Sequence, residues 1–160
     1  MAGKREGRGD AGGDDGRDYP GIQGGRVSDF LVDANVLLDV ATTDPVWSSW
    51  SERQLRNAAA RGAVCINPII FAEVAPAFST EAELESWLEP SIFRRLALPY
   101  AAGWRVAEAF RKYRRSGGAK LLPLPDFYIG AHAETDKLTL ITRDAARYRT
   151  YFPSIDLITP

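Results

Sequence analysis

Cysteine, histidine and long apolar runs are all scarce in this chain of 160 residues. The single cysteine, Cys65, excludes an internal disulfide framework and a cysteine-rich zinc site. The single histidine, His132, leaves very little for histidine-based metal sites or for Ser-His and Cys-His relays. No apolar stretch approaches the roughly 18 residues of a membrane span, and the N-terminus lacks the apolar core of a signal peptide. We therefore expect a cytoplasmic protein that does not act on a membrane.

The chain also has almost no net charge, because 20 Lys and Arg residues oppose 21 Asp and Glu residues. This balance argues against a protein that coats nucleic acid through bulk charge, so any nucleic-acid contact must come from a local basic patch. With so little histidine and cysteine, carboxylates are the main supply of chemistry if the protein is an enzyme.

Residues 1–26 differ from the rest of the chain in composition. They hold most of the 14 glycines, interleaved acidic and basic residues, and almost no large apolar side chains. Such a segment cannot offset its own ordering entropy by burying apolar surface. We predict a disordered, glycine-rich N-terminal extension over residues 1–26 and a single domain over residues 27–160.

Apolar runs typical of strands alternate with segments of helical periodicity throughout this domain. Buried strands are predicted at 30–32, 63–66, 138–142 and 155–158, with a short strand or a linker at 94–98. Helices are predicted at 45–60, 68–75, 80–88, 101–115 and 126–136, with a helical turn at 145–148. This alternation indicates an α/β fold in which helices flank both faces of a central parallel β-sheet.

Four acidic residues stand out by their positions relative to these elements. Asp33 directly follows the first strand, Asp144 follows the 138–142 strand, and Asp126 opens a helix. Glu73 lies within an otherwise apolar helix. Taken singly, the aspartates are good helix or turn caps and Glu73 faces solvent from a helix edge. Capping does not explain the whole set, because chemistry in open α/β sheets collects where strands end and helices begin.

Four converging carboxylates would repel one another unless a divalent cation neutralised them. Oxygen-only ligands select hard ions such as Mg²⁺ or Mn²⁺. The chemistry implied is metal-assisted hydrolysis of a phosphodiester, in which metal-activated water is the nucleophile.

Four sequence segments together carry a resemblance to a known family. They are Phe30-Leu31-Val32-Asp33-Ala34-Asn35-Val36-Leu37-Leu38-Asp39, Ala72-Glu73-Val74, Leu124-Pro125-Asp126-Phe127-Tyr128-Ile129-Gly130-Ala131-His132-Ala133, and the segment from Leu140 to Phe152. In this order and at these separations they resemble PIN-domain ribonucleases, and specifically the VapC-type toxins of VapBC toxin–antitoxin systems. The similarity covers residues 28–160.

This resemblance implies a PIN-like fold and a Mg²⁺- or Mn²⁺-dependent endoribonuclease. It places Asp33, Glu73, Asp126 and Asp144 in the acidic quartet that binds the metal and positions the water. It also makes Asn35 the polar support of the first aspartate and Thr142 the hydroxyl beside the last one. The partners implied are RNA as substrate, a cognate VapB-type antitoxin and a second copy of the chain in a homodimer.

A basic cluster on the 101–115 helix and the turn after it is our candidate for phosphate contact. Its members are Arg111, Arg114, Arg115 and Lys120, with Lys112 on the same helix. The alternative is a solvated helix face. We interpret His132 as a packed, hydrogen-bonded residue, Cys65 as a buried strand residue and Asp136 as a solvated surface acid. Among Trp47, Trp50 and Trp87, we expect at least one in the core and the others at an interface.

Two other functions are compatible with parts of this pattern. One is a catalytically silent PIN fold that binds RNA or protein, although the retention of all four acids argues against it. The other is a phosphatase or different nuclease that uses a carboxylate cluster. A haloacid-dehalogenase-like phosphatase needs a second aspartate two residues after the nucleophile, where this chain has Asn35.

Overall fold

The computed structural model describes residues 28–160, and the predicted extension over residues 1–26 lies outside them. A parallel sheet of five strands forms the centre, in the order β3-β2-β1-β4-β5. The strands are β1 (Phe30–Val32), β2 (Val64–Ile66), β3 (Phe93–Arg95), β4 (Thr139–Ile141) and β5 (Leu157–Ile158). The predicted α/β class and the parallel sheet are confirmed.

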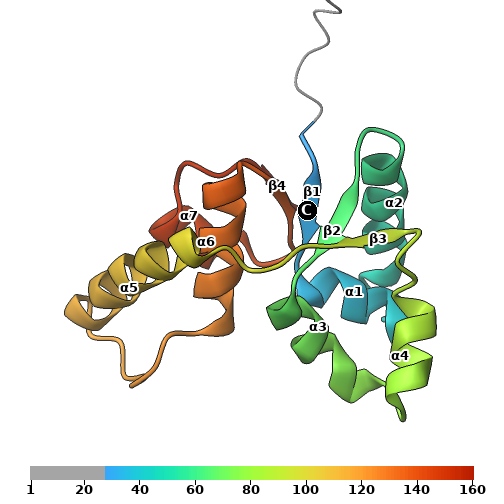
Figure 1. Ribbon diagram of the computed structural model, residues 1–160, viewed down its shortest axis with the longest axis horizontal. Coiled ribbons are helices and arrows are strands. Elements are labelled where there is room, and N and C mark those ends of the chain that lie inside the picture. The colour runs from blue at the N-terminus through green and yellow to red at the C-terminus, as the bar shows by residue number, and fades with distance from the viewer. Residues whose placement is uncertain (1–27) are drawn as a thin grey trace, which may run out of the picture.

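Helices cover the sheet on both faces. One group comprises α1 (Ala34–Ala41), α2 (Ser48–Ala59), α3 (Pro68–Val74), the 3₁₀ turn η1 (Ala75–Ala77) and α4 (Glu81–Trp87). The other comprises α5 (Tyr100–Arg115), α6 (Pro125–Asp136) and α7 (Ala145–Tyr151). Figure 1 shows the two groups on opposite sides of the strands. The chain order explains this, because right-handed crossovers toward opposite sheet edges place their helices on opposite faces.

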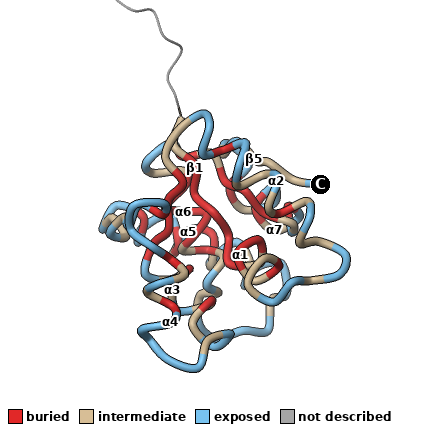
Figure 2. The backbone as a smooth tube through the Cα atoms, turned by 90° about the vertical axis from the view of Figure 1, so that its right-hand side faces the viewer, coloured by how far each residue is buried: buried red, intermediate tan, exposed pale blue. Residues whose placement is uncertain are grey.

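The core lies along the central strands, where every residue of β1 and β2 is buried. Such strands, covered on both faces, read as continuous apolar runs in the sequence rather than as alternating ones. Figure 2 shows the burial following these strands and the facing sides of the helices. Cys65 lies in β2 and is fully buried, as the sequence predicts.

Helix α1 was absent from the sequence-based prediction. The sequence-based prediction ends the first strand at residue 32 and places no helix before residue 45, whereas the chain turns at Asp33 and forms a helix that buries Val36 and Leu37. The predicted start of the next helix at residue 45 was also wrong, because α2 begins only at Ser48. The Asp44 carboxylate accepts hydrogen bonds from the backbone N–H groups of Val46 and Trp47, and these hold a turn before the helix.

Other differences concern the lengths of elements. The edge strand β3 begins one residue before the predicted 94–98 segment and ends at Arg95, and it pairs with β2 in parallel. The predicted helical turn at 145–148 continues as α7 to Tyr151. Helix α4 is capped at its start, since the Thr80 hydroxyl accepts a hydrogen bond from the N–H of Glu83 at 3.2 Å. None of the helices within residues 28–160 is both long enough and apolar enough to cross a bilayer.

Two helical glycines give a matched test of this packing. A Cβ on Gly130, in α6, would lie 2.4 Å from the Phe152 ring, whereas a Cβ on Gly103, in α5, would meet nothing within 4 Å. We expect Gly130→Ala to lower the free energy of unfolding by about 1–3 kcal/mol through overpacking. Gly103→Ala should raise it by up to about 1 kcal/mol through helix propensity. Urea denaturation measures both, and equal effects would contradict the packing described.

Candidate active site

The candidate site lies where the strand order changes direction, between β1 and β4. Asp33 follows β1, and Thr142 and Asp144 follow β4 on the neighbouring strand. Helix α3 follows β2 and carries Glu73, while the start of α6 carries Asp126. The carboxyl ends of parallel strands therefore bring together segments that are distant in the sequence.

Asp33 is the centre of a hydrogen-bond network. Its side chain is buried, and three groups donate to the same oxygen, Oδ2. They are the hydroxyl of Thr142 at 2.7 Å, the hydroxyl of Tyr148 at 3.0 Å and the amide Nδ2 of Asn35 at 3.1 Å. All three donors converge on Oδ2, so the second oxygen, Oδ1, remains for another ligand.

The donors to Asp33 are themselves held by the backbone that follows β4. The N–H of Arg143 donates to Asn35 Oδ1 at 3.2 Å. The N–H of Asp144 donates to the Thr142 hydroxyl at 3.1 Å. These bonds fix the rotamers of Asn35 and Thr142, so the orientation of Asp33 depends on the loop between β4 and α7.

Asp33 and Glu73 lie close enough to neighbouring carboxylates for the negative charges to raise their pKa. Burial raises the pKa of Asp33, and the negative charge of Asp126 raises it further, against the effect of the Thr142 and Tyr148 hydroxyls. Burial, followed by the charges of Asp33 and Asp126, raises the pKa of Glu73 to about 7. The cluster is thus short of positive charge, which is the condition that a bound cation would relieve.

Tyr148 is buried beside these acids. Burial raises its pKa well above the usual value, and the charges of Asp33, Asp126 and Glu73 raise it further. Its hydroxyl therefore stays protonated and donates to Asp33. Sequence analysis assigned no role to Tyr148. Its three-residue spacing from the buried Ala145 on α7 is a weak signal that it points inward.

One internal cation already reaches the cluster. The Nη1 atom of Arg147, on α7, forms an ion pair with Asp126 Oδ2. Both side chains are partly exposed, at 39% for Arg147 and 25% for Asp126. No basic residue adjoins Asp126 in the sequence, so this partner, 21 residues away, was missed.

Asp144 is placed differently from the other three acids. It is exposed, occupies the N-cap position of α7 and makes no side-chain capping bond. Its charge is not among those that raise the pKa of Asp33 or Glu73. The structure therefore brings Asp33, Glu73 and Asp126 together and leaves Asp144 at the rim.

The donor chemistry of the three clustered acids fits a hard divalent cation, because all the ligands are carboxylate oxygens. As the side chains stand, however, no three acidic, histidine or cysteine residues within 28–160 are arranged to hold one ion. The Arg147–Asp126 pair is one reason, since it directs an Asp126 oxygen toward α7. A metal ion would therefore compete with Arg147 for Asp126.

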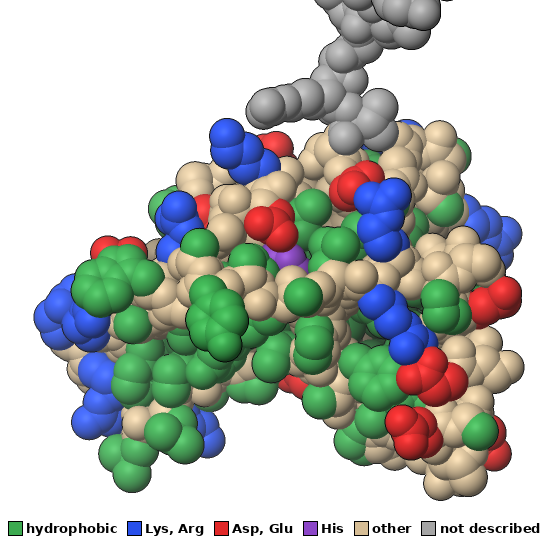
Figure 3. Space-filling model, in the orientation of Figure 1, with side chains coloured by type: hydrophobic (Ala, Val, Ile, Leu, Met, Phe, Trp, Pro, Cys, Tyr) green, Lys and Arg blue, Asp and Glu red, His purple; other side chains and the backbone are tan. Residues whose placement is uncertain are grey.

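The predicted basic cluster lies at the far end of α5, where Lys and Arg side chains gather in Figure 3. Arg114 is engaged locally, donating to the carbonyl oxygens of Gly118 at 2.8 Å and Lys120 at 3.1 Å. The Arg111 guanidinium lies 4.9 Å from the centre of the Trp104 ring. Arg115 and Lys120 are exposed. Of these residues, Arg115 and Lys120 are the most available for contact with a ligand.

His132 is fully buried and hydrogen-bonded, as the sequence analysis favoured. The amide of Asn67, the N-cap of α3, lies 3.0 Å from Nδ1, and Asp136 Oδ2 lies 3.0 Å from Nε2. Burial lowers the pKa of His132, so it is neutral, with Nδ1 accepting and Nε2 donating. Asp136 is exposed, in agreement with its interpretation as a solvated surface acid, and its carboxylate also accepts this bond. Trp50 and Trp87 pack against the core.

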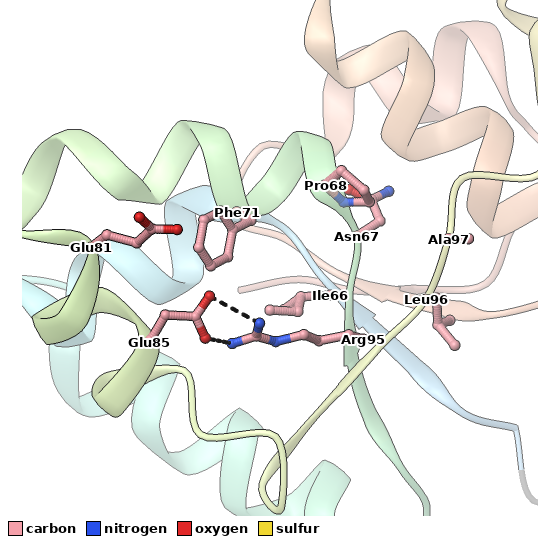
Figure 4. Close-up of a pocket in the computed structure, with 9 residues that line it drawn as sticks. All are labelled: Ile66, Asn67, Pro68, Phe71, Glu81, Glu85, Arg95, Leu96 and Ala97. Atoms are coloured by element: carbon pink, nitrogen blue, oxygen red, sulfur yellow. Dashed lines mark hydrogen bonds and ion pairs between the residues drawn. The ribbon is translucent and has the colours of Figure 1, made fainter.

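A second concavity, of about 400 Å³, lies between α3, α4 and β3. Figure 4 shows that the Glu85–Arg95 ion pair crosses it and that Phe71 forms one wall. None of the four predicted acids lines this pocket. The candidate site is therefore the carboxylate cluster and not this cavity.

The raised pKa of Glu73 predicts a pH-dependent stability. Its folded pKa, about 7, lies above the ordinary value of 4.5, so the metal-free folded protein binds a proton that the unfolded chain releases between these pH values. The contribution of Glu73 to stability therefore falls as pH rises from about 4.5 to about 7. Glu73→Gln should remove this penalty and raise the melting temperature at pH 8 by roughly 2–4 °C, or about 1 kcal/mol after solvent screening.

Differential scanning fluorimetry in EDTA at pH 5 and pH 8 measures the effect. Glu108→Gln, on the exposed face of α5, is the control. A Glu73→Gln variant whose difference from wild type is the same at both pH values would contradict the raised pKa.

Comparison with known proteins was made for the whole chain. The PIN domain family model matches residues 30–153. No curated protein sequence matches the chain. Among solved structures, a chain of VapBC2 from Rickettsia felis, bound to a DNA fragment from its promoter, superposes with a TM-score of 0.64 and 16% identity. The match covers 82% of this chain and 98% of that one.

Two further structures show the same likeness. A chain of DNA-bound VapBC from Salmonella typhimurium gives a TM-score of 0.61 and 18% identity over 82% of this chain and 98% of that one. A chain of a toxin–antitoxin complex from Klebsiella pneumoniae gives 0.59 and 24% over 81% and 96%, respectively. At these identities the likeness concerns the fold, whereas the family match extends over most of the sequence. The chain belongs to the PIN domain family.

Proposed function

We propose that this protein is a Mg²⁺- or Mn²⁺-dependent endoribonuclease and the toxin of a type II toxin–antitoxin pair. The observation that carries the proposal is the convergence of Asp33, Glu73 and Asp126 at the carboxyl ends of the central strands of a PIN fold. The burial that raises the pKa of Asp33 and Glu73 suits a site that receives a cation.

In this proposal Asp33 Oδ1, Glu73 and Asp126 hold the ion, with Asp144 as the outermost member of the acidic quartet. A bound Mg²⁺ or Mn²⁺ would lower the pKa of the attacking water and neutralise charge that develops on the phosphate. The residues of this chain supply the orientation. Thr142, Tyr148 and Asn35 hold Asp33 Oδ2 and so aim the other oxygen into the site.

Proton binding and metal binding compete at Glu73. Because its pKa is about 7 in the metal-free protein, a fraction of the molecules carries a proton on this carboxyl at neutral pH. A metal ligand must lose its proton, so the affinity for the ion should rise as the pH rises through 7. Arg147 would also compete with the ion, because its guanidinium pairs with Asp126.

The proposals for the toxin role and for the antitoxin partner rest on solved structures that share this fold. Solved structures with this fold include chains of VapBC and FitAB complexes and of a toxin–antitoxin complex, some of them bound to DNA. By this likeness we propose a VapB-type antitoxin as the protein partner. RNA as the substrate and a homodimer as the assembly are proposed from the resemblance of the sequence motifs to VapC-type PIN domains. Arg111, Arg114, Arg115 and Lys120 remain our candidates for RNA contact, with Arg115 and Lys120 the most accessible.

A catalytically silent PIN module is the alternative, and one observation favours it. The Arg147–Asp126 ion pair neutralises part of the cluster without a metal. A silent module that binds RNA or protein would keep this pair permanently, whereas the nuclease would exchange it for the ion.

The first prediction from this proposal concerns catalysis. Asp33→Asn and Asp126→Asn should each lower the rate of RNA cleavage in Mn²⁺ by about 100-fold or more, because each removes a charged ligand of the ion. The assay is gel analysis of a structured RNA with purified full-length protein. Asp156→Asn, the same change at an exposed aspartate before β5, is the matched control and should cleave normally. Cleavage at the wild-type rate by either site variant would refute the mechanism.

The second prediction separates the nuclease from the silent module without measuring activity. Mn²⁺ at about 100 times its dissociation constant should stabilise the wild-type protein by about 2.7 kcal/mol and raise its melting temperature by roughly 5–10 °C. Asp33→Asn should lose most of this shift, and EDTA should reverse it. A wild-type protein with the same melting temperature in Mn²⁺ and in EDTA would support the silent module.

A further inference from the structure

A cavity of about 340 Å³ lies next to the carboxylate cluster, between α5 and α7. Two tyrosines contribute to its lining, Tyr113 from α5 and Tyr151 from the end of α7. The rest of the lining belongs to α7 and its N-cap: Asp144, Ala146, Arg147 and Thr150. Arg147 connects the cavity to the site described above, because the same side chain pairs with Asp126.

The two tyrosine rings are held in place before any ligand arrives. The Tyr113 hydroxyl accepts a hydrogen bond from the N–H of Lys120 at 3.3 Å. The backbone of Gly118 packs so closely on the Tyr113 ring that a Cβ there would lie 2.3 Å from it. The Tyr151 ring packs edge-on against Phe127, with 5.0 Å between the ring centres. Rings that are already ordered lose little conformational entropy when a ligand stacks on them.

Positively and negatively charged side chains lie at different places around the cavity. Lys112 lies at one edge, where its ammonium donates to the Thr150 carbonyl oxygen at 2.7 Å and lies 5.6 Å from the centre of the Tyr151 ring. Arg147 supplies a second cation toward the carboxylate cluster. The exposed carboxylate of Asp144 disfavours an anion within the cavity. The two tyrosine rings pack against each other edge to face, with 6.4 Å between their centres, so a planar group cannot lie between them. A phosphate therefore fits the cationic edge, and an uncharged planar group fits against the sides of the two rings that line the cavity.

We propose that this cavity binds one nucleotide of single-stranded RNA, with its base against Tyr113 and Tyr151 and an adjoining phosphate on Lys112 and Arg147. This inference rests on the proposed function and deepens it, since it places a nucleotide next to the phosphodiester on which the carboxylates act. Unstacked bases of single-stranded RNA are commonly held on aromatic side chains, with Lys and Arg on the backbone. A peptide side chain would not need both cations, so RNA is the better fit.

The test fills the cavity without removing any of its walls. Ala146 is exposed near the start of α7 and lines the cavity, so Ala146→Leu occupies the space and leaves both tyrosines in place. Ala101→Leu, at an exposed alanine of α5 that does not line the cavity, is the matched control. All proteins carry Asp33→Asn, so that the RNA survives in Mg²⁺, and melting temperatures verify that each variant is folded.

Fluorescence anisotropy measures binding of two probes, a short oligocytidylate and an oligomer of the same length from which the bases have been removed. With Ala146 present, the oligocytidylate should bind at least about 10-fold more tightly, as expected from base stacking. Ala146→Leu should reduce the affinity for the oligocytidylate by about 5-fold or more and leave the abasic oligomer unaffected. Lys112→Gln should weaken both probes equally and reduce the salt slope by about 0.7, the loss of one phosphate contact.

The outcomes separate the two proposals. Equal affinities for the two probes, or an Ala146→Leu protein that binds like the Ala101→Leu control, would overturn the nucleotide site and leave the cavity to a protein partner. If the protein with native Asp33 still cleaves RNA in that case, the proposed nuclease stands. If the native protein neither binds nor cleaves RNA, both proposals fail together.

Discussion

The buried charge of Asp33 is the constraint on which the rest of the site depends. A carboxylate at the end of a central strand is costly unless it is hydrogen-bonded or paired with a cation. In this fold, three hydrogen-bond donors from three segments offset this cost. They are Asn35 at the start of α1, Thr142 after β4 and Tyr148 on α7. Each donor is in turn fixed by packing or by the backbone. The same hydrogen bonds therefore stabilise the loop after β4 and orient the candidate catalytic oxygen.

The negative charge of the clustered carboxylates explains why a cationic side chain lies at the site. Three carboxylates that lie this close together need a positive partner, and in the metal-free protein Arg147 supplies part of it through Asp126. Tyr148 and Arg147 are neighbours on α7, so one short helix carries both the donor that orients Asp33 and the cation that balances Asp126. The position of α7 thus couples the geometry of the cluster to its charge.

The same helix has a second face directed at α5. There Arg147, Ala146, Thr150 and Tyr151 meet Tyr113 and form the cavity in which we place a nucleotide. A single side chain, Arg147, borders both the carboxylates and the cavity. This arrangement gives a physical route by which the binding of RNA and the loading of the metal influence each other, because an arginine that turns to a phosphate releases Asp126 for the ion.

The sequence by itself determined the class of the fold, the order of its strands along the chain and the identity of the acids. Continuous apolar runs such as Phe30-Leu31-Val32 are typical of strands covered on both faces, and acids that follow such runs meet at one edge of a parallel sheet. It did not show α1, because an apolar strand and an apolar helix that adjoin have no periodicity to separate them. Nor did it show the partnership of Arg147 with Asp126, the donation from Tyr148 or the outward position of Asp144. These contacts join residues far apart in the chain, and only the packing of α6 and α7 against the sheet decides which side chains meet.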